Sequence, residues 1–283
     1  MAPVAYYAMG GGLGHLVRAR AVLATLGLEG EGHVLSASVH ARDPRILGPL
    51  ASHTPPKECA VTPEGLAKWI ERTLHELAAE TVFVDVFPGG LLGELSRPLW
   101  KPGAKLCYVG RLLRWPEYQI RLRAPLPNFD IAYLVEPLHP DHQAAMAAVC
   151  GQVEELRLQD PPTPLPPPLP DDTWVVLHSG PREEVAELLA YGRDIQSSEG
   201  IEAELRVVGP AAAESGSHPW LPQFPATGYF QQATRVITAC GFNVMRQSLG
   251  ARARHHFMPF ARPLDDQFTR AERRRINEQR RTF

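Results

Sequence analysis

Seven prolines lie within eleven positions near the middle of the chain, between Asp160 and Pro170. Proline lacks a backbone N–H and fixes φ, so this density prevents helix and sheet and favours an extended, semi-rigid spacer. The 283 residues leave room for a domain of roughly 100–200 residues on each side. We therefore predict an N-terminal domain (1–159), a linker (160–170) and a C-terminal domain (171–283). The alternative, a proline-rich surface loop within one domain, is less favoured because a strand pattern restarts on each side.

Short apolar runs alternate with helical patterns on both sides of the linker. Before it, we expect strands at Val4–Met9, His33–Ser38, Thr81–Phe87, Lys105–Val109 and Asp130–Val135, and helices at His15–Leu26, Pro63–Ala79 and His139–Val153. After it, we expect strands at Thr173–His178, Ala203–Val208, Arg235–Thr238 and His256–Pro259, and helices at Arg182–Ser197 and Phe242–Leu249. The alternation predicts an α/β protein with two doubly wound, Rossmann-like domains facing a cleft. Ligands of such sheets collect at the carboxyl ends of the strands.

The composition excludes several classes of protein. The 29 Lys and Arg residues nearly balance 31 Asp and Glu, so no strong field favours nucleic acid. The four cysteines form no C-x-x-C pair, and neither a zinc cluster nor a disulfide framework is indicated. The first residues lack a signal-peptide pattern, and no apolar run approaches the ~18 residues of a membrane span. We expect a cytoplasmic protein without a metal or cofactor.

A glycine-rich turn follows the first predicted strand and leads into a helix that His15 opens. Its glycines let the backbone turn sharply and bring amide groups near a ligand; they are Gly10, Gly11, Gly12 and Gly14. The spacing matches neither the dinucleotide fingerprint nor a P-loop. The helix dipole would lower the pKa of His15 and leave a neutral imidazole that accepts a proton. A solvent-facing histidine cap is the alternative, but the position after strand one favours a functional histidine.

A second group of polar residues lies near the C-terminus. Gly241 turns the chain after a strand, and Asn243 lies at a helix start whose N–H groups suit a diphosphate. Carboxylate and amide groups that suit sugar hydroxyls come after the next strand, at Asp265, Asp266 and Gln267. One of the two aspartates is also expected to cap the helix that begins at Gln267.

The GGGLGH segment followed by a basic helix, and the G-F-N-x-x-x-x-S-L … P-F-A-R-P-L-D-D-Q segment, resemble GT-B-fold glycosyltransferases. The closest likeness is to the bacterial group that includes the N-acetylglucosaminyltransferase of peptidoglycan synthesis. Residues 40–170 match only in their order of strands and helices. The resemblance implies a first domain that takes the acceptor and a second that holds a nucleotide sugar, typically UDP-linked. It implies His15 as the base, and as donor contacts Gly241, Phe242, Asn243, Gln247, Asp266 and Gln267. Gln247 stands where the family usually has a Glu that grips the ribose, so the charge-assisted bond is lost.

The mechanism that we expect is inverting, metal-independent displacement at the anomeric carbon. The chain has no D-x-D pair, so backbone N–H groups, helix dipoles and Arg side chains would stabilise the departing diphosphate. His15 would take the proton of the attacking hydroxyl. Asp85 would assist that base from across the cleft, and Glu136 has the same standing, although strand-end carboxylates are more often caps. Ser179 and Gly180 follow the second domain's first strand, where small residues let the backbone approach phosphates.

The acceptor class stays open among small molecules, glycans and lipid-linked compounds. Residues 111–123 mix four Arg with apolar side chains and could touch an anionic membrane at its inner face if the acceptor is a lipid. Because Pro116 breaks any single helix there, we expect a solvated helix or loop. The six Arg between Arg270 and Phe283 would complement the dipole of the last helix.

Two other functions fit the sequence. The string G-x-G-H-x-x-R, from Gly12 to Arg18, resembles nucleotide-sugar hydrolases of pseudaminic acid synthesis, which use water in place of an acceptor. A nucleotide-sugar-binding protein without catalysis is the third interpretation, which Gln247 keeps open.

Overall fold

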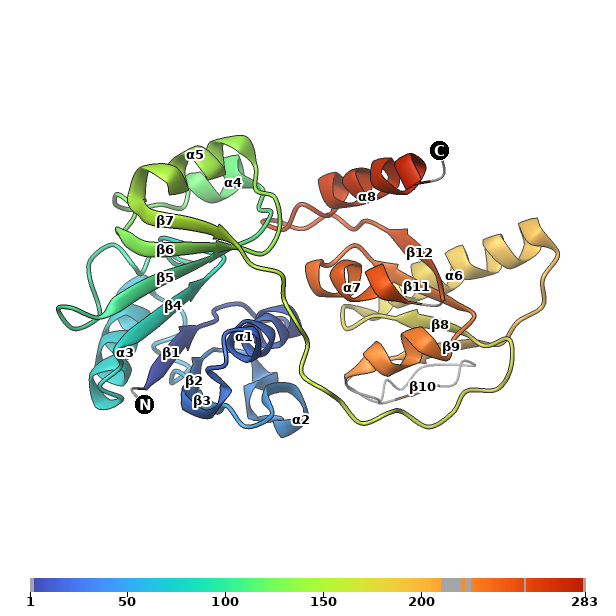
Figure 1. Ribbon diagram of the computed structural model, residues 1–283, viewed down its shortest axis with the longest axis horizontal. Coiled ribbons are helices and arrows are strands. Elements are labelled where there is room, and N and C mark those ends of the chain that lie inside the picture. The colour runs from blue at the N-terminus through green and yellow to red at the C-terminus, as the bar shows by residue number, and fades with distance from the viewer. Residues whose placement is uncertain (1–2, 210–219, 222–224, 252, 282–283) are drawn as a thin grey trace. The chain divides into compact units, whose positions relative to one another are not determined.

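A computed structural model describes residues 3–209, 220–221, 225–251 and 253–281. The chain forms two compact units: Met1–Pro161 with Pro263–Asp265, and Pro162–Arg262 with Asp266–Phe283. Each is built on one parallel sheet with helices (Figure 1). The predicted α/β class with two parallel, doubly wound sheets is confirmed.

The first unit has a seven-stranded sheet in the order β3-β2-β1-β4-β5-β6-β7, and every pair of neighbours is parallel. Its strands are β1 (Val4–Tyr7), β2 (Gly32–Leu35), β3 (Ala51–His53), β4 (Thr81–Asp85), β5 (Lys105–Gly110), β6 (Phe129–Leu134) and β7 (Cys150–Glu155). Its helices are α1 (Leu13–Thr25), α2 (Pro44–Leu47), α3 (Pro63–Glu76), α4 (Trp115–Gln119) and α5 (Pro140–Val149). The strand order reverses between β1 and β4, which is where open α/β sheets bind ligands.

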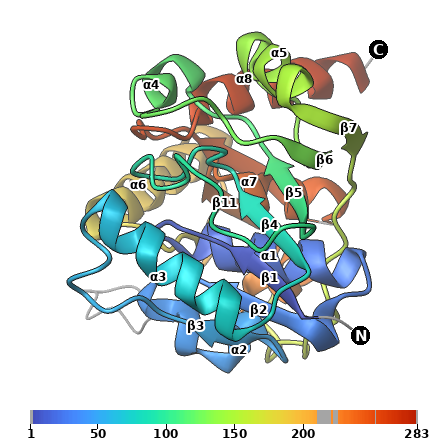
Figure 2. The same cartoon turned by 90° about the vertical axis from the view of Figure 1, so that its left-hand side faces the viewer.

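Helix α3 shows why these segments fold as they do. Pro63 occupies its first turn, and the Thr62 hydroxyl accepts a hydrogen bond from the N–H of Gly65. Its buried residues recur at helical spacing, namely Leu66, Trp69, Ile70, Thr73 and Leu74. This apolar face packs against side chains of β1, β4 and β5, and α3 lies across that face of the sheet in Figure 2. The helix therefore covers one face of the strands that carry the candidate site.

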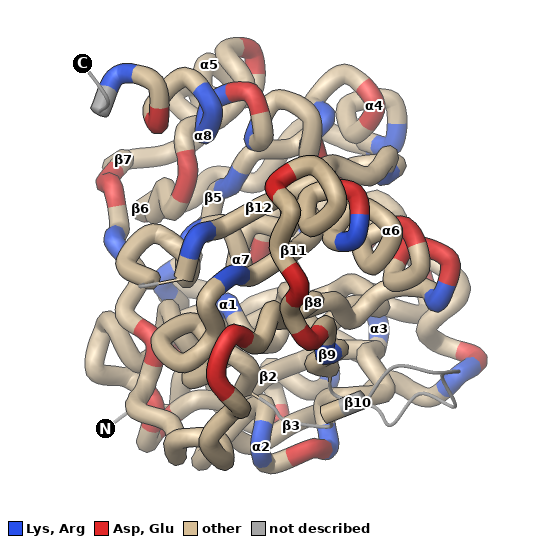
Figure 3. The backbone as a smooth tube through the Cα atoms, turned by 90° about the vertical axis from the view of Figure 1, so that its right-hand side faces the viewer, with Lys and Arg blue, Asp and Glu red and all other residues tan. Residues whose placement is uncertain are grey.

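The second unit repeats this order with five parallel strands, β10-β9-β8-β11-β12. They are β8 (Trp174–Leu177), β9 (Leu205–Val208), β10 (Trp220–Leu221), β11 (Arg235–Ala239) and β12 (Arg254–Met258). Its helices are α6 (Arg182–Glu199), α7 (Phe242–Gln247) and α8 (Gln267–Arg281). Val185 and Leu188 of α6 pack on Trp174 and Val176 of the central strand. Acidic and basic residues are interspersed along α6 and α8 (Figure 3).

The proline-rich segment carries no helix or strand, as its composition predicts. Hydrogen bonds nevertheless hold the chain just before this segment and in its second half. The N–H of Gln159 donates to the Thr25 hydroxyl at 2.9 Å, within the first unit. Gln232 of the second unit accepts from the N–H of Leu169 at 3.0 Å and donates to the carbonyl of Pro166 at 3.2 Å. The last prolines are therefore fixed to the second unit.

Several sequence-based expectations about elements are wrong. The helix expected over 139–153 ends at Val149, and Cys150–Glu155 instead forms the edge strand β7. Most β7 side chains are exposed, so its polar sequence did not indicate a strand. The short elements β3, α2 and β10 were not predicted at all. The elements β3 and β10 have only three and two residues, and α2 has four, so none of them shows a repeating apolar pattern.

The expected solvated helix or loop over residues 111–123 is only partly observed, because residues 111–113 are buried whereas 119–121 are exposed. Pro116 lies in the first turn of α4, where a missing N–H costs nothing. Most of the apolar side chains fill the core of the first unit, namely Leu112, Leu113, Trp115 and Tyr118, and Ile120 is exposed. Across the described ranges, no helix is both long and apolar enough to cross a membrane.

Gln267 joins the ends of two strands in the second unit. Its side chain is buried, and Oε1 accepts hydrogen bonds from the N–H of Cys240 at 3.3 Å and of Phe260 at 3.1 Å. Arg270, one turn along α8, donates to the carbonyl of Cys240 at 2.8 Å. The residues that follow β11 and β12 are therefore tied to the first turn of α8.

Gln267→Ala should lower the free energy of unfolding by about 1–3 kcal/mol for each buried amide that loses its acceptor. Chemical denaturation measures the change. Gln143→Ala, at an exposed position of α5, is the matched control and should be neutral within about 0.5 kcal/mol. A Gln267→Ala protein as stable as this control would contradict the bridging role.

Candidate active site

His15 is the third residue of α1, and the helix follows β1 through the glycine-rich turn. Its side chain is 13% exposed, so the ring is mostly covered yet keeps a surface. The ring lies against Gly10, where an added methyl group would clash with it, and Gly10 has φ +153°. Gly11, Gly12 and Gly14 are exposed. Residue 10 must therefore lack a side chain to leave room for the His15 ring.

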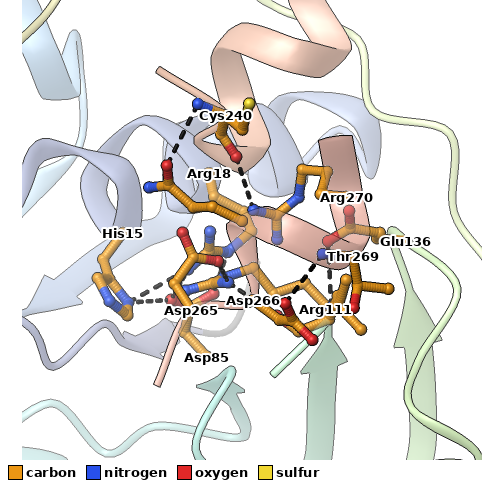
Figure 4. A network of polar contacts seen from close by, with 12 residues as sticks. His15, Arg18, Asp85, Arg111, Glu136, Cys240, Asp265, Asp266, Thr269 and Arg270 are labelled. Atoms are coloured by element: carbon orange, nitrogen blue, oxygen red, sulfur yellow. Dashed lines mark hydrogen bonds and ion pairs between the residues drawn. The ribbon is translucent and has the colours of Figure 1, made fainter. Parts of the chain in front are cut away.

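Asp85 is the last residue of β4, next to β1 in the same sheet. Its carboxylate is buried and lies 2.6 Å from His15 Nδ1 (Figure 4). Arg18 donates to both oxygens, from Nε to Oδ1 at 2.7 Å and from Nη2 to Oδ2 at 2.5 Å. The Tyr6 hydroxyl donates to Oδ1 at 2.8 Å. The expectation that Asp85 acts from across a cleft is wrong, because adjacent parallel strands of one sheet bring the two residues together.

This arrangement fixes the tautomer of the imidazole. An ionised carboxylate only accepts hydrogen bonds, so His15 Nδ1 carries the proton and Nε2 keeps its lone pair. Burial raises the pKa of Asp85, but Arg18 and His15 outweigh it and hold that pKa well below its usual range. Burial lowers the pKa of His15; Asp85 opposes this, and Arg18 and Arg111 add to it. The ring is therefore a neutral proton acceptor, and burial is the main cause that lowers its pKa.

The backbone just after Asp85 is strained. Val86 has φ +67°, and the N–H of Phe87 donates to the carbonyl of Asp85 at 2.7 Å, which closes a γ-turn. Such a conformation costs on the order of 1–3 kcal/mol in a β-branched residue. The Tyr108 hydroxyl donates to the carbonyl of Val86 at 2.7 Å, and the Phe87 ring lies 5.6 Å from the His15 ring. The turn thus ends β4 abruptly and packs an aromatic ring on the imidazole.

Asp265 and Asp266 have different partners. Asp265 belongs to the first unit, where it pairs with the nearly buried Arg111 and forms a bridge with Leu113. Asp266 belongs to the second unit, and its Oδ1 accepts from the N–H of Thr269 at 3.0 Å. The cap expected at one of the two aspartates is therefore Asp266. Glu136, after β6, accepts from the N–H of Leu112 at 3.1 Å.

The other donor-side candidates lie at the carboxyl edge of the second sheet. Ser179 and Gly180 follow β8 and are exposed. Gly241 follows the adjacent β11 and is the N-cap of α7, which contains Phe242, Asn243 and Gln247. The strand order reverses between β8 and β11, so these residues meet at a switch point.

A polar cluster that no sequence pattern predicted lies beside Gly180. His178 Nε2 lies 2.7 Å from Glu184 Oε2, and Arg262 pairs with both oxygens of Glu184. An added methyl group on Gly180 would clash with His178, so the pair lies directly against this glycine. Burial lowers the pKa of His178 against the opposing effect of Glu184. The i, i+6 spacing across a strand–helix turn carries no familiar signal.

Arg18 and Tyr6 were also unassigned. The i, i+3 spacing of His15 and Arg18 on one helix is the signal that could have paired them. Within the described ranges, His, Cys, Asp and Glu side chains form no group of three or more able to hold a metal ion.

No protein-family model matches the chain, and no curated protein matches its sequence. Solved structures do match its fold. The glycosyltransferase SnogD from Streptomyces nogalater is 14% identical with a TM-score of 0.56, over 96% of this chain and 84% of that one. The spinosyn forosaminyltransferase SpnP is 14% identical with a TM-score of 0.62, over 96% and 82%. A putative UDP-N-acetylglucosamine 2-epimerase from Listeria monocytogenes is 14% identical with a TM-score of 0.51, over 87% and 76%.

The chain has the GT-B fold. At 14% identity these matches establish a shared architecture and leave the reaction of this chain to its own residues.

Asp85→Asn should remove the preference for a proton on His15 Nδ1, because an amide can donate as well as accept. Nitrogen NMR of the labelled imidazole distinguishes the two tautomers. We expect one tautomer in the unchanged protein and a mixture in the variant, whereas Asp141→Asn, at an exposed position, should change nothing. A proton found on Nε2 of the unchanged protein would contradict the assignment.

Proposed function

We propose that this protein transfers a sugar from a nucleotide-sugar donor to an acceptor hydroxyl, with His15 as the general base. The observation that carries the proposal is the His15–Asp85 pair at the switch point of the first sheet. Asp85 holds the proton on Nδ1, which leaves Nε2 to take the proton of the attacking oxygen. The GT-B fold supports the same reaction class.

In the proposed reaction the acceptor oxygen attacks the anomeric carbon as the bond to the diphosphate breaks. The acceptor proton passes to His15 Nε2, the electron pair of the broken bond leaves with the diphosphate, and the anomeric configuration inverts. The absence of a D-x-D pair in the sequence supports a route without a metal ion. The first unit would then hold the acceptor and the second unit the donor.

The donor side rests on the resemblance of the Gly241–Gln247 and Asp266–Gln267 segments to GT-B glycosyltransferases. The fold supports it by gathering these segments, with Ser179 and Gly180, at one edge of the second sheet. Among the matched structures, SsfS6 from Streptomyces sp. SF2575 is complexed with thymidine diphosphate and Phytolacca americana UGT2 with UDP-2-fluoro-glucose and pterostilbene. We propose a UDP-linked hexose or N-acetylhexosamine as donor. Sugars linked to thymidine diphosphate should be included when candidate donors are tested.

The finer likeness to the peptidoglycan-synthesis group rests on the sequence motifs alone. An acceptor panel of small molecules, glycans and lipid-linked sugars distinguishes the acceptor classes, and only a lipid-linked acceptor would require contact with a membrane.

Hydrolysis of the nucleotide sugar is the second candidate. The observation that favours it is the G-x-G-H-x-x-R string, whose His15 and Arg18 both bind Asp85. The same base would activate water in place of an alcohol. Incubation with UDP-sugars and no acceptor separates the two functions, because a hydrolase releases free sugar rapidly while a transferase waits for its acceptor.

His15→Ala should lower turnover by about 10²–10⁴-fold and leave donor binding nearly unchanged, because proton transfer assists only the transition state. Turnover should fall on the acid side as the imidazole protonates. Since the pKa of His15 is lowered, the midpoint of that limb should lie below about 6.5, and the limb should vanish in the variant.

Turnover per folded molecule is measured beside thermal unfolding, and His75→Ala, at an exposed position of α3, is the matched control. Full activity in a folded His15→Ala protein would exclude the base and leave the second-unit donor site untouched.

Asp266→Asn should weaken binding of the UDP-sugar about tenfold, which corresponds to the loss of one charge-assisted hydrogen bond. Asparagine caps helices as well as aspartate does, so stability and free UDP binding should stay unchanged. Calorimetry with UDP and with a UDP-sugar measures both, and Asp171→Asn, at an exposed position, is the control. Equal losses for the two ligands, or a nucleotide that contacts only the first unit, would contradict the donor assignment.

A further inference from the structure

Arg18 has no role in the proposed reaction so far, although it belongs to the same motif as His15. Its side chain is 2% exposed, so it cannot serve as a surface contact for a substrate. It lies three positions after His15 along α1, which places both side chains on one face of the helix. That face meets the carboxyl end of β4, where Asp85 lies.

The two side chains share one oxygen atom. His15 Nδ1 lies 2.6 Å and Arg18 Nη2 lies 2.5 Å from Asp85 Oδ2. Tyr6 and Arg18 Nε occupy Oδ1. These four donors match the roughly four lone-pair positions of a carboxylate, which holds Asp85 in one orientation.

The charges oppose a second proton on the imidazole. In an isolated His–Asp pair, the full negative charge of the carboxylate stabilises the imidazolium. Here the Arg18 guanidinium offsets part of the effect of the Asp85 charge, and Nη2 lies 3.2 Å from His15 Nδ1. An imidazolium would therefore stand beside a buried cation.

Among the remaining groups around the ring, Arg111 acts in the same direction as Arg18. From β1, Tyr6 is a neutral phenol, because burial raises its pKa well above the usual value. From the segment after β5, the Arg111 cation pairs with Asp265. From the turn after β4, Phe87 carries no charge. Arg18 is thus the cation that binds the carboxylate of the pair directly.

We propose that Arg18 is a positioning residue that keeps His15 a neutral proton acceptor, by locking Asp85 against Nδ1 and offsetting part of its charge. The inference rests on the proposed function, in which His15 is the base. It has two consequences for turnover. The base stays unprotonated in mildly acid conditions, and the proton that it takes from an acceptor is readily released again.

The test is the titration of His15, followed by NMR of the full chain with labelled histidine. In the unchanged protein the midpoint should lie below about 6.5. Arg18→Met keeps most of the side-chain length and removes the charge, so the midpoint should rise by about 1–2 pH units. Arg20→Met, two residues along the same helix, should leave the midpoint unchanged because Arg20 faces Glu29 and the carbonyl of Arg45.

Arg18→Lys keeps the positive charge but loses the paired N–H donors of the guanidinium. Its His15 midpoint should stay near that of the unchanged protein. A midpoint in Arg18→Met that stays or falls would overturn the proposal. If Arg18→Met does not fold, either of two other results would overturn the proposal. One is a His15 midpoint above about 6.5 in the unchanged protein. The other is a His15 midpoint in Arg18→Lys that rises to the value found in the unfolded chain.

Turnover gives a second measurement that a merely structural role would not move. In Arg18→Met the acid limb of the rate should shift to higher pH together with the NMR midpoint. A uniform loss of rate at every pH would show a structural role. If no nucleotide sugar is turned over at all, the proposed function fails while the titration still tests Arg18. If His15 is required for turnover but its midpoint ignores Arg18, only this inference fails.

Discussion

The buried carboxylate of Asp85 governs the construction of the first sheet's carboxyl edge. An ionised carboxylate out of contact with water is costly unless charged and polar donors surround it. Those donors come from two elements, Tyr6 from β1 and His15 and Arg18 from α1. The strained turn at Val86 ends the strand directly after Asp85. The Tyr108 hydroxyl donates a hydrogen bond to the carbonyl of Val86. One charge thus couples two adjacent strands, a helix and a turn.

The two units share one strand topology and have similar clusters of a histidine, a carboxylate and an arginine. Both sheets reverse their strand order beside the first strand of the unit, between β1 and β4 and between β8 and β11. At each reversal a histidine lies within hydrogen-bond distance of a carboxylate that an arginine also binds. In the first unit the carboxylate ends the neighbouring strand. In the second it comes from Glu184, in the first turn of the following helix, with Arg262 supplied after β12. The first cluster therefore couples strands, whereas the second fixes the loop around Gly180.

How much the sequence predicts depends on whether a segment buries apolar side chains. The central strands β1, β4, β5, β8 and β11 were predicted because burial on both faces makes them continuous apolar runs. Edge strands such as β7 are held by backbone pairing, which leaves no pattern in the side chains. His15 could be found from its place after strand one. Asp85 could be named as its partner but not placed, because the pairing depends on which strands are neighbours and not on the 70 positions that separate the two residues in the sequence.

The cluster at Asp85 is better understood as a device for orientation than as a source of stability. A buried ion pair returns little net stability, since desolvation offsets most of its Coulomb energy, and apolar residues of similar volume often fold as well. What apolar residues cannot do is hold an imidazole with its proton on Nδ1 and its lone pair on Nε2. The strain at Val86 and the clash that keeps Gly10 without a side chain point the same way, because both fix the ring's surroundings at the cost of local stability. A chain selected only to fold would have no reason to keep all of these features around one histidine.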